Sequence, residues 1–241
     1  MPPRTHTASE VRSSFHSQKR WEEFSGELPA LLIFRPISFW ITPWFLRAGW
    51  SAARVTLLSG AFAIAMFAAA WLGGDHAYLL VALMGCVVQT LDCVDGNIAR
   101  VTGTVSHAGQ FLDLLVGQIY WALLFISIGL LVERSGGGLF GAYALEAALA
   151  LPILVLLNRV TRNYAQLHFS RKQIMDEPPE KPLAWTSLVL IGLAGLENLY
   201  VFAVWIGGAF GVLDLVLLGI ALYVLGVFLY VEIELYLDLR A

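Results

Sequence analysis

Charged residues are scarce in this chain of 241 residues. Asp, Glu, Lys and Arg make up 14% of it, against 58% for hydrophobic residues. This balance excludes an ordinary soluble domain, in which about a quarter of the residues carry charge. No basic surface for nucleic acid is indicated either, because the net charge is −3 and the basic residues are dispersed along the chain. The composition is typical of an integral membrane protein.

Cysteine is also rare. The two cysteines, Cys86 and Cys93, fall in one hydrophobic segment, so they offer neither a disulfide framework nor the spacing of a metal site. No cleavable signal peptide is expected, because residues 1–29 are polar and charged and lack the apolar run that such a signal needs. We expect residues 1–29 to form a polar cytoplasmic tail.

Long hydrophobic runs, in contrast, are plentiful. A helix needs about 20 apolar residues to cross a bilayer, and six such stretches can be drawn, at roughly 51–72, 76–91, 109–132, 139–157, 183–206 and 212–232. The segment 30–50 is rich in aromatic residues, but its two arginines and two prolines favour an amphipathic helix lying in the interface over a seventh span. We therefore predict an all-α integral membrane protein, with an interfacial helix at 30–50 and a six-helix membrane domain at 51–241.

The distribution of basic residues predicts the orientation. With a cytoplasmic N-terminus, fourteen of the fifteen Lys and Arg residues fall on the inner side and only Arg134 falls outside. Such a bias follows the positive-inside rule. We expect a multi-pass protein whose N-terminus and functional site face the cytoplasm.

Three carboxylates and an arginine interrupt the apolar pattern between residues 92 and 113. Charge in a membrane segment is costly and usually marks function. Asp92 and Asp95 are three residues apart, so on a helix they face the same way, and Gly96 leaves room for a ligand near the backbone. With Asp113 they form an acidic cluster that suits a hard divalent cation, and a cation suits a diphosphate. A salt-bridge network with Arg100 is the alternative, but it would leave two acids unpaired.

The order and spacing of this segment, LDCVDGNIARVTGTVSHAGQFLD, resemble the signature of the CDP-alcohol phosphatidyltransferases, D-x2-D-G-x2-A-R-x8-G-x3-D-x3-D. Seven of its eight fixed positions match, at Asp92, Asp95, Gly96, Ala99, Arg100, Gly109 and Asp113. Gly117 stands at the eighth position, where the family has the aspartate proposed as general base for the acceptor hydroxyl. The resemblance supports fold and nucleotide binding more directly than turnover.

The resemblance also implies roles for the matching residues. Asp92, Asp95 and Asp113 would hold one or two Mg²⁺ or Mn²⁺ ions. The CDP group would be bound by Gly96, Ala99, Arg100 and Gly109. Thr56, at the start of the first span, is what remains of a Pro-Asn-Thr/Ser pattern that relatives often carry, and it is a further candidate contact to the nucleotide.

Another residue would have to act as the base if Gly117 replaces the fourth aspartate. His107 is one candidate, because histidine exchanges protons near neutral pH. Glu232, at the inner end of the last span, is another. For both, a solvated surface role is the alternative interpretation.

Three functions are compatible with these patterns. The favoured one is a membrane transferase that moves a substituted phosphate from a CDP-alcohol, such as CDP-diacylglycerol, to an acceptor hydroxyl with release of CMP, in phospholipid biosynthesis. The second is a degenerate member that binds CDP-lipid and metal without turnover. The third, an ion transporter, is less favoured because the cluster lies at the membrane rim and no internal repeat is evident.

Expected partners are the CDP-alcohol donor, an acceptor alcohol and membrane lipids. The spacing of Gly219 and Gly226 fits close helix packing and a homodimer.

Overall fold

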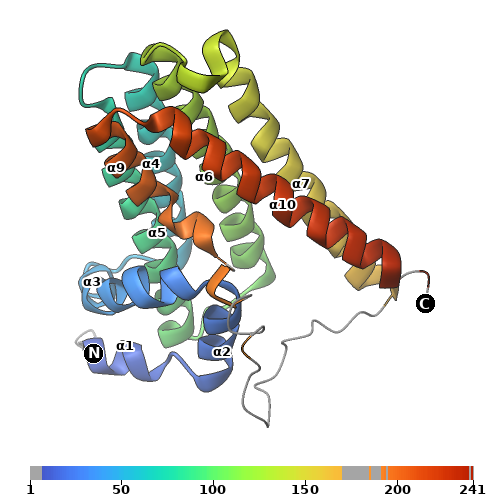
Figure 1. Cartoon of the computed structure of the whole chain (residues 1–241). Helices are drawn as coiled ribbons and strands as arrows, with labels where there is room; N and C mark the ends of the chain where they lie inside the picture. Colours follow the sequence, from blue (N-terminus) through green and yellow to red (C-terminus); the bar gives the residue numbers. More distant parts are fainter. Residues whose placement is uncertain (1–6, 170–184, 186–190, 194, 239, 241) are drawn as a thin grey trace. The chain divides into compact units, whose positions relative to one another are not determined.

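A computed structural model describes residues 7–169, 185, 191–193, 195–238 and 240 of the chain (Figure 1). These residues form helices, turns and short connections, with no strand among them. The all-α prediction is therefore confirmed. The helical elements are α1 (Ala8–Ser13), α2 (Ser17–Gly26), η1 (Ala30–Phe34), α3 (Arg35–Arg47), α4 (Ala52–Leu72), α5 (Ala77–Thr102), α6 (His107–Arg134), η2 (Gly138–Tyr143), α7 (Ala144–Phe169), η3 (Leu196–Leu199), α9 (Tyr200–Phe210) and α10 (Leu213–Asp238).

Several of these helices are long and apolar enough to cross a membrane. Among the described residues five qualify, at Ala52–Leu72, Ala77–Thr102, His107–Arg134, Gly138–Ala165 and Leu213–Asp238. The predicted count of six is not confirmed. In its described part the expected span 183–206 contains most of a shorter apolar helix, Leu196–Phe210, and much of the preceding stretch lies outside the described residues.

Helix α5 runs further than the hydrophobic pattern indicated. The apolar run ends at residue 91, yet α5 continues to Thr102 and carries Asp92 and Asp95 within it. The continuation is stabilised by burial of Val94 and Ile98, which are 0% and 1% exposed and belong to one apolar cluster. Apolar residues on one face thus keep the helix intact through its polar segment.

A tight turn joins α5 to α6. Gly103 has a φ of 67°, a left-handed conformation that glycine adopts without strain, and the Thr104 N–H donates to the Ala99 carbonyl at 2.9 Å. Three residues later the Ser106 hydroxyl accepts the Gly109 N–H at 3.1 Å, which caps the start of α6. The turn therefore brings the first residues of α6 back toward the end of α5.

The segment before residue 30 contains two short helices in its described part, although its polar composition predicted a tail. Helix α1 begins with a capping box between Thr7 and Glu10. Val11 and Phe15 are buried, at 0% and 4% exposure. These two apolar side chains attach an otherwise polar segment to the protein.

Helix α3 is amphipathic. Ser38 and Thr42 are fully buried on one face, whereas Trp40 and Trp44 are 74% and 73% exposed on the other. Exposed tryptophans of this kind are typical of helices at the membrane–water interface. The predicted amphipathic character is thus present in α3, and its position at the interface stays a prediction.

The chain divides into two compact units. The first comprises Met1–Ile64, Leu83–Tyr120 and Met175–Leu199, and the second comprises Ala65–Ala82, Trp121–Ile174 and Tyr200–Ala241. Helices α4, α5 and α6 contribute residues to both units. Within the second unit, α7 and α10 pack side by side (Figure 1).

Candidate active site

The three aspartates of the motif belong to the first unit. Asp92 and Asp95 lie on α5, and Asp113 lies two turns into α6. Each carboxylate interacts electrostatically with the other two. Asp95 is 6% exposed, whereas Asp92 and Asp113 are open to solvent. The α5–α6 turn thus gathers like charges that repel one another and attract a cation.

A third helix contributes to this cluster. Thr56 of α4 is 4% exposed, and its hydroxyl donates to Asp95 Oδ2 at 2.6 Å. A bond this short to a carboxylate is typical of a charge-assisted hydrogen bond. The structure therefore places Thr56 on the carboxylate of Asp95, a contact that the motif spacing alone did not reveal.

Arg100 lies close over the backbone of α5. A Cβ on Gly96 would lie 3.2 Å from a guanidinium nitrogen of Arg100, so the room that Gly96 leaves is used by this side chain. Arg100 donates to Asn97 Oδ1 at 2.8 Å, and its guanidinium lies 5.8 Å from the centre of the Phe15 ring. Its Nε is buried and has no hydrogen-bond partner among the described residues. Arg100 therefore retains donor capacity for an anionic ligand.

A buried polar network lies beneath the cluster. Arg35 donates from Nε to Glu23 Oε2 at 2.9 Å, and a second short bond joins its Nη2 to Glu23 Oε1. Nη1 of Arg35 donates to the Cys93 carbonyl at 3.0 Å and to Asn97 Oδ1 at 3.3 Å. Glu23 and Arg35 are only 2% and 6% exposed. A bidentate pair of this kind fixes both elements, α2 and α3, against α5.

The side-chain amide of Asn97 extends this network. Its Nδ2 donates to Ser38 Oγ at 2.9 Å and to Thr42 Oγ1 at 3.1 Å. The motif does not indicate this network, because position 97 is one of its variable positions. The available signal was the spacing of Ser38 and Thr42, four residues apart and therefore on one face of an apolar helix.

Glu27 is a further carboxylate in this region that the motif does not contain. It follows α2 directly, and its N–H donates to the Glu23 carbonyl at 2.8 Å. The Glu27 carbonyl accepts the Leu31 N–H at 3.0 Å. Asp92 interacts electrostatically with Glu27. The end of α2 is connected to the segment of α5 that carries Asp92 through Arg35, which bonds both Glu23 and the Cys93 carbonyl.

The carboxyl group of Glu27 lies in a crowded environment, although the residue is accessible to solvent. Partial removal of the carboxyl group from water raises the pKa of Glu27. Repulsion from Glu23 and Asp113 acts in the same direction, while Lys19 and Arg35 act in the opposite one. The Glu27 carboxylate is therefore a better proton acceptor than an isolated glutamate.

The remaining motif positions lie on the same two helices. Ala99 lies one turn before the end of α5, and Gly109 is bound to the Ser106 cap of α6. His107 is the first residue of α6 and is exposed, six positions before Asp113. Gly117 lies one turn after Asp113 on α6, and a Cβ added to it would meet no atom within 4 Å.

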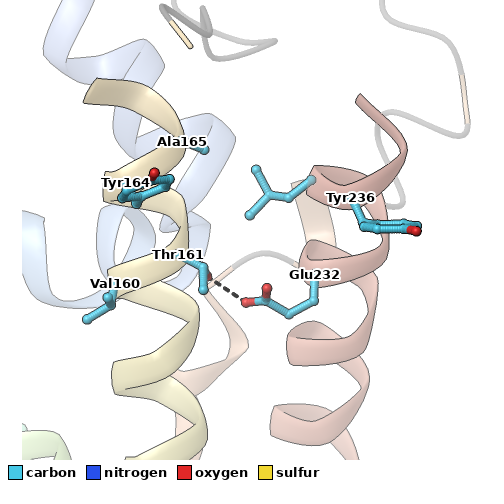
Figure 2. Close-up of a pocket in the computed structure, with 7 residues that line it drawn as sticks. Val160, Thr161, Tyr164, Ala165, Glu232 and Tyr236 are labelled. Carbon is cyan, nitrogen blue, oxygen red and sulfur yellow. Dashed lines mark hydrogen bonds between the residues drawn. The ribbon is translucent and has the colours of Figure 1, made fainter. Parts of the chain in front are cut away.

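Glu232, the other predicted base, belongs to the second unit. It lines a cavity of ≈ 400 Å³ between α7 and α10, shown in Figure 2. The Thr161 hydroxyl donates to Glu232 Oε1 at 2.6 Å. The other lining residues are Val160, Tyr164, Ala165, Leu235 and Tyr236. The environment of Glu232 is thus mainly apolar, and the three aspartates belong to the other unit.

The donor chemistry of the aspartates suits Mg²⁺ or Mn²⁺, which prefer carboxylate oxygens. Within the described part of the chain, however, no three His, Cys, Asp or Glu side chains lie close enough together to hold a metal ion. One oxygen of Asp95 already accepts the Thr56 hydroxyl. A cation here would need water or substrate phosphates among its ligands, an arrangement that Mg²⁺ commonly adopts.

Comparison with known proteins places the chain in a family. A family model described as CDP-alcohol phosphatidyltransferase matches residues 50–217. A search of curated proteins gives no match. The matched range contains Thr56 and the three aspartates, whereas Glu23, Glu27 and Arg35 precede it.

Proposed function

Because the chain belongs to the CDP-alcohol phosphatidyltransferase family, a family of transferases, we propose that it moves a substituted phosphate from a CDP-alcohol to an acceptor hydroxyl and releases CMP. CDP-diacylglycerol is the donor that we favour, because a membrane protein can receive this lipid directly from the leaflet. The product would then be a phospholipid, and the reaction would belong to phospholipid biosynthesis.

The grouping of Asp92, Asp95 and Asp113 is the observation that carries this proposal. Three mutually repelling carboxylates in long apolar helices are costly unless a ligand compensates their charge. A divalent cation bound by these oxygens would neutralise charge on the diphosphate and polarise the reacting phosphorus. The Thr56 hydroxyl fixes one of these carboxylates, Asp95, in orientation.

The remaining motif residues would bind the donor. Arg100 has an unpartnered buried Nε and lies one turn beyond Gly96, so it is placed to donate to a phosphate oxygen. Ala99 and Gly109 have small side chains or none, which allows a nucleotide to approach the helix backbone. These contacts would orient the donor, and orientation is a large part of catalysis in phosphoryl transfer.

The distribution of Lys and Arg supports a cytoplasmic site. Fourteen of the fifteen basic residues belong to the side that carries the N-terminus in the predicted topology. A soluble nucleotide product such as CMP would leave to the cytosol from there, while lipid substrates enter sideways from the bilayer.

Gly117 favours a second candidate function. Without a carboxylate at this position the protein could bind CDP-lipid without turning it over. A general base contributes about 10²–10⁴-fold to a rate, so its absence would reduce the activity severely unless another residue replaces it.

Release of CMP tests the proposal. The purified protein would be incubated in detergent with CDP-diacylglycerol, Mg²⁺ or Mn²⁺ and a panel of small and lipid alcohols, beside an Asp92→Asn variant. We expect release that depends on the cation and falls by about 10²–10³-fold in the variant, the usual cost of losing one group that stabilises transition-state charge.

Binding measurements separate the two candidates. Release with any acceptor supports the transferase. No release, together with thermal stabilisation of the wild type but not of Asp92→Asn by CDP-diacylglycerol, supports a binding protein. If neither release nor stabilisation is seen, both functions are wrong.

A further inference from the structure

Position 117 leaves a gap in the proposed reaction. Gly117 has no side chain to accept a proton, and a Cβ atom added there would meet no atom within 4 Å. The acceptor hydroxyl must nevertheless lose its proton when it attacks phosphorus. A carboxylate from another element of the first unit is the simplest replacement.

The end of α2, which also belongs to the first unit, carries the acidic residues Glu23 and Glu27. Their carboxylates differ in whether they are already hydrogen-bonded. Both oxygens of Glu23 accept from the Arg35 guanidinium, in a pair that is almost completely buried. Glu27 is accessible to solvent, and within the described part of the chain its carboxylate makes no hydrogen bond or ion pair. Only Glu27 is therefore free to accept a proton from a ligand.

The buried network holds the backbone of Glu27 in place. Arg35 bridges Glu23 and the carbonyl of Cys93, the residue next to Asp92. Glu27 follows Glu23 by one helical turn and is bonded to it through the backbone. Three linked hydrogen bonds thus connect the backbone of the base candidate to the segment of α5 that carries Asp92 and Asp95. Electrostatic interaction of Glu27 with Asp92 and Asp113 agrees with this placement.

We propose that Glu27 accepts the proton of the acceptor hydroxyl, the role that Gly117 cannot fill. This inference rests on the proposed transferase function. The hydroxyl oxygen forms a bond to the phosphorus that carries the donor alcohol, and the bond from this phosphorus to the bridging oxygen of CMP breaks. The proton passes to the Glu27 carboxylate, and CMP leaves with the electron pair of the broken bond. Glu27 then returns the proton to water.

Four variants test the proposal in the CMP-release assay with CDP-diacylglycerol: Glu27→Gln, Glu22→Gln, Gly117→Asp, and Glu27→Gln combined with Gly117→Asp. Glu27→Gln removes the proton acceptor and keeps the shape of the side chain. We expect kcat to fall by about 10²–10⁴-fold, with the KM for CDP-diacylglycerol and the melting temperature unchanged. Glu22→Gln, which changes an exposed neighbour paired with Lys19 at 3.4 Å, is the matched control and should keep the wild-type kcat.

The double variant combines Glu27→Gln with Gly117→Asp. The open space at position 117 admits the new side chain, and an aspartate there restores the complete family motif. We expect the double variant to recover most of the lost kcat. A purely structural role of Glu27 would not be rescued from position 117.

The outcomes are distinct. Wild-type kcat in Glu27→Gln overturns the proposal, and so does a loss that Gly117→Asp does not restore. An inactive wild type that becomes active as the single variant Gly117→Asp also overturns it, because the site then works and lacks a base. If the wild type and Gly117→Asp are both inactive, the transferase function itself is wrong and the proposal for Glu27 is overturned with it.

Discussion

The two units of this protein differ in how many polar side chains they bury. Of the eleven buried polar or charged residues in the described part of the chain, all but Ser127 belong to the first unit. They include an ion pair, Glu23 with Arg35, and a motif carboxylate, Asp95. Apolar helices that expose large side chains occur in both units, for example at Leu222 and Ile233 in the second and at Leu57 and Leu83 in the first.

This difference indicates that the first unit retains buried polar groups at a cost in folding free energy. Buried charge is costly and is retained where it orients reactive groups or excludes alternatives. In the first unit the buried groups connect α2, α3 and α5 around the aspartates. The comparison predicts that equivalent polar substitutions will have larger effects in the first unit than in the second.

The buried ion pair should give the largest effect on stability. Glu23→Gln removes the negative charge and leaves the Arg35 guanidinium buried and uncompensated. We expect the free energy of unfolding to fall by about 3–5 kcal/mol, the usual cost of breaking a buried pair. Thermal unfolding of the purified protein in detergent measures this loss.

The adjacent residue supplies the control. Glu22 forms an ion pair with Lys19 at 3.4 Å, but the two side chains are 48% and 35% exposed. Glu22→Gln should therefore cost about 1 kcal/mol or less. Equal losses in the two variants would show that burial of the Glu23–Arg35 pair does not matter.

The hydrogen bond between α4 and α5 should give the next largest effect. Thr56→Val keeps the shape of the side chain and removes the hydroxyl that holds Asp95 at 2.6 Å. We expect a loss of about 1.5–3 kcal/mol of stability, as for hydrogen bonds to charged groups. CMP release should fall about tenfold or more, the factor that corresponds to about 1.4 kcal/mol. Thr56→Ser retains the hydroxyl and should stay close to the wild type in both measurements.

The sequence predicts which residues form the site more directly than it predicts the contacts that support them. The motif spacing places Asp92 and Asp95 on one helix and Asp113 on the next, and the structure has them on α5 and α6; that they bind a metal together stays a prediction. The long apolar runs likewise predicted a helical membrane protein, confirmed by five helices of sufficient length. The count of six went further than the described residues support, because the stretch preceding Leu196 contains residues outside them.

The contacts made by the N-terminal segment could not be predicted in the same way. Glu23 and Glu27 lie in a sequence whose local composition is that of a polar tail, and only tertiary contacts distinguish them from solvated residues. In the sequence, Arg35 is one of the two arginines that argue against a seventh span. That argument does not predict which residues Arg35 bonds to. Its bonds to Cys93 and Asn97 join residues 58 and 62 positions away, and no local pattern encodes such a distance.

The smallest effect is expected for a matched substitution in the second unit. Thr161→Val removes a hydroxyl that donates to Glu232 at 2.6 Å, the same length as the bond from Thr56 to Asp95. Thr161 and Glu232 are both partly exposed, so water can replace the lost bond. We expect about 0.5–1.5 kcal/mol of destabilisation, measured by thermal unfolding beside Thr56→Val.

The rates of CMP release by Thr161→Val and Thr56→Val test the comparison between the two units most directly. CMP release should remain near the wild-type rate in Thr161→Val, because the variant changes the α7–α10 cavity and leaves the buried groups around Asp95 intact. Thr161→Ser, which keeps the donor, controls for the loss of the methyl group. If Thr161→Val lost as much activity as Thr56→Val, Glu232 would have to be counted among the reacting groups. The proposed division into a polar unit that contains the reacting groups and an apolar supporting unit would then be wrong, since one short hydrogen bond would matter equally in both.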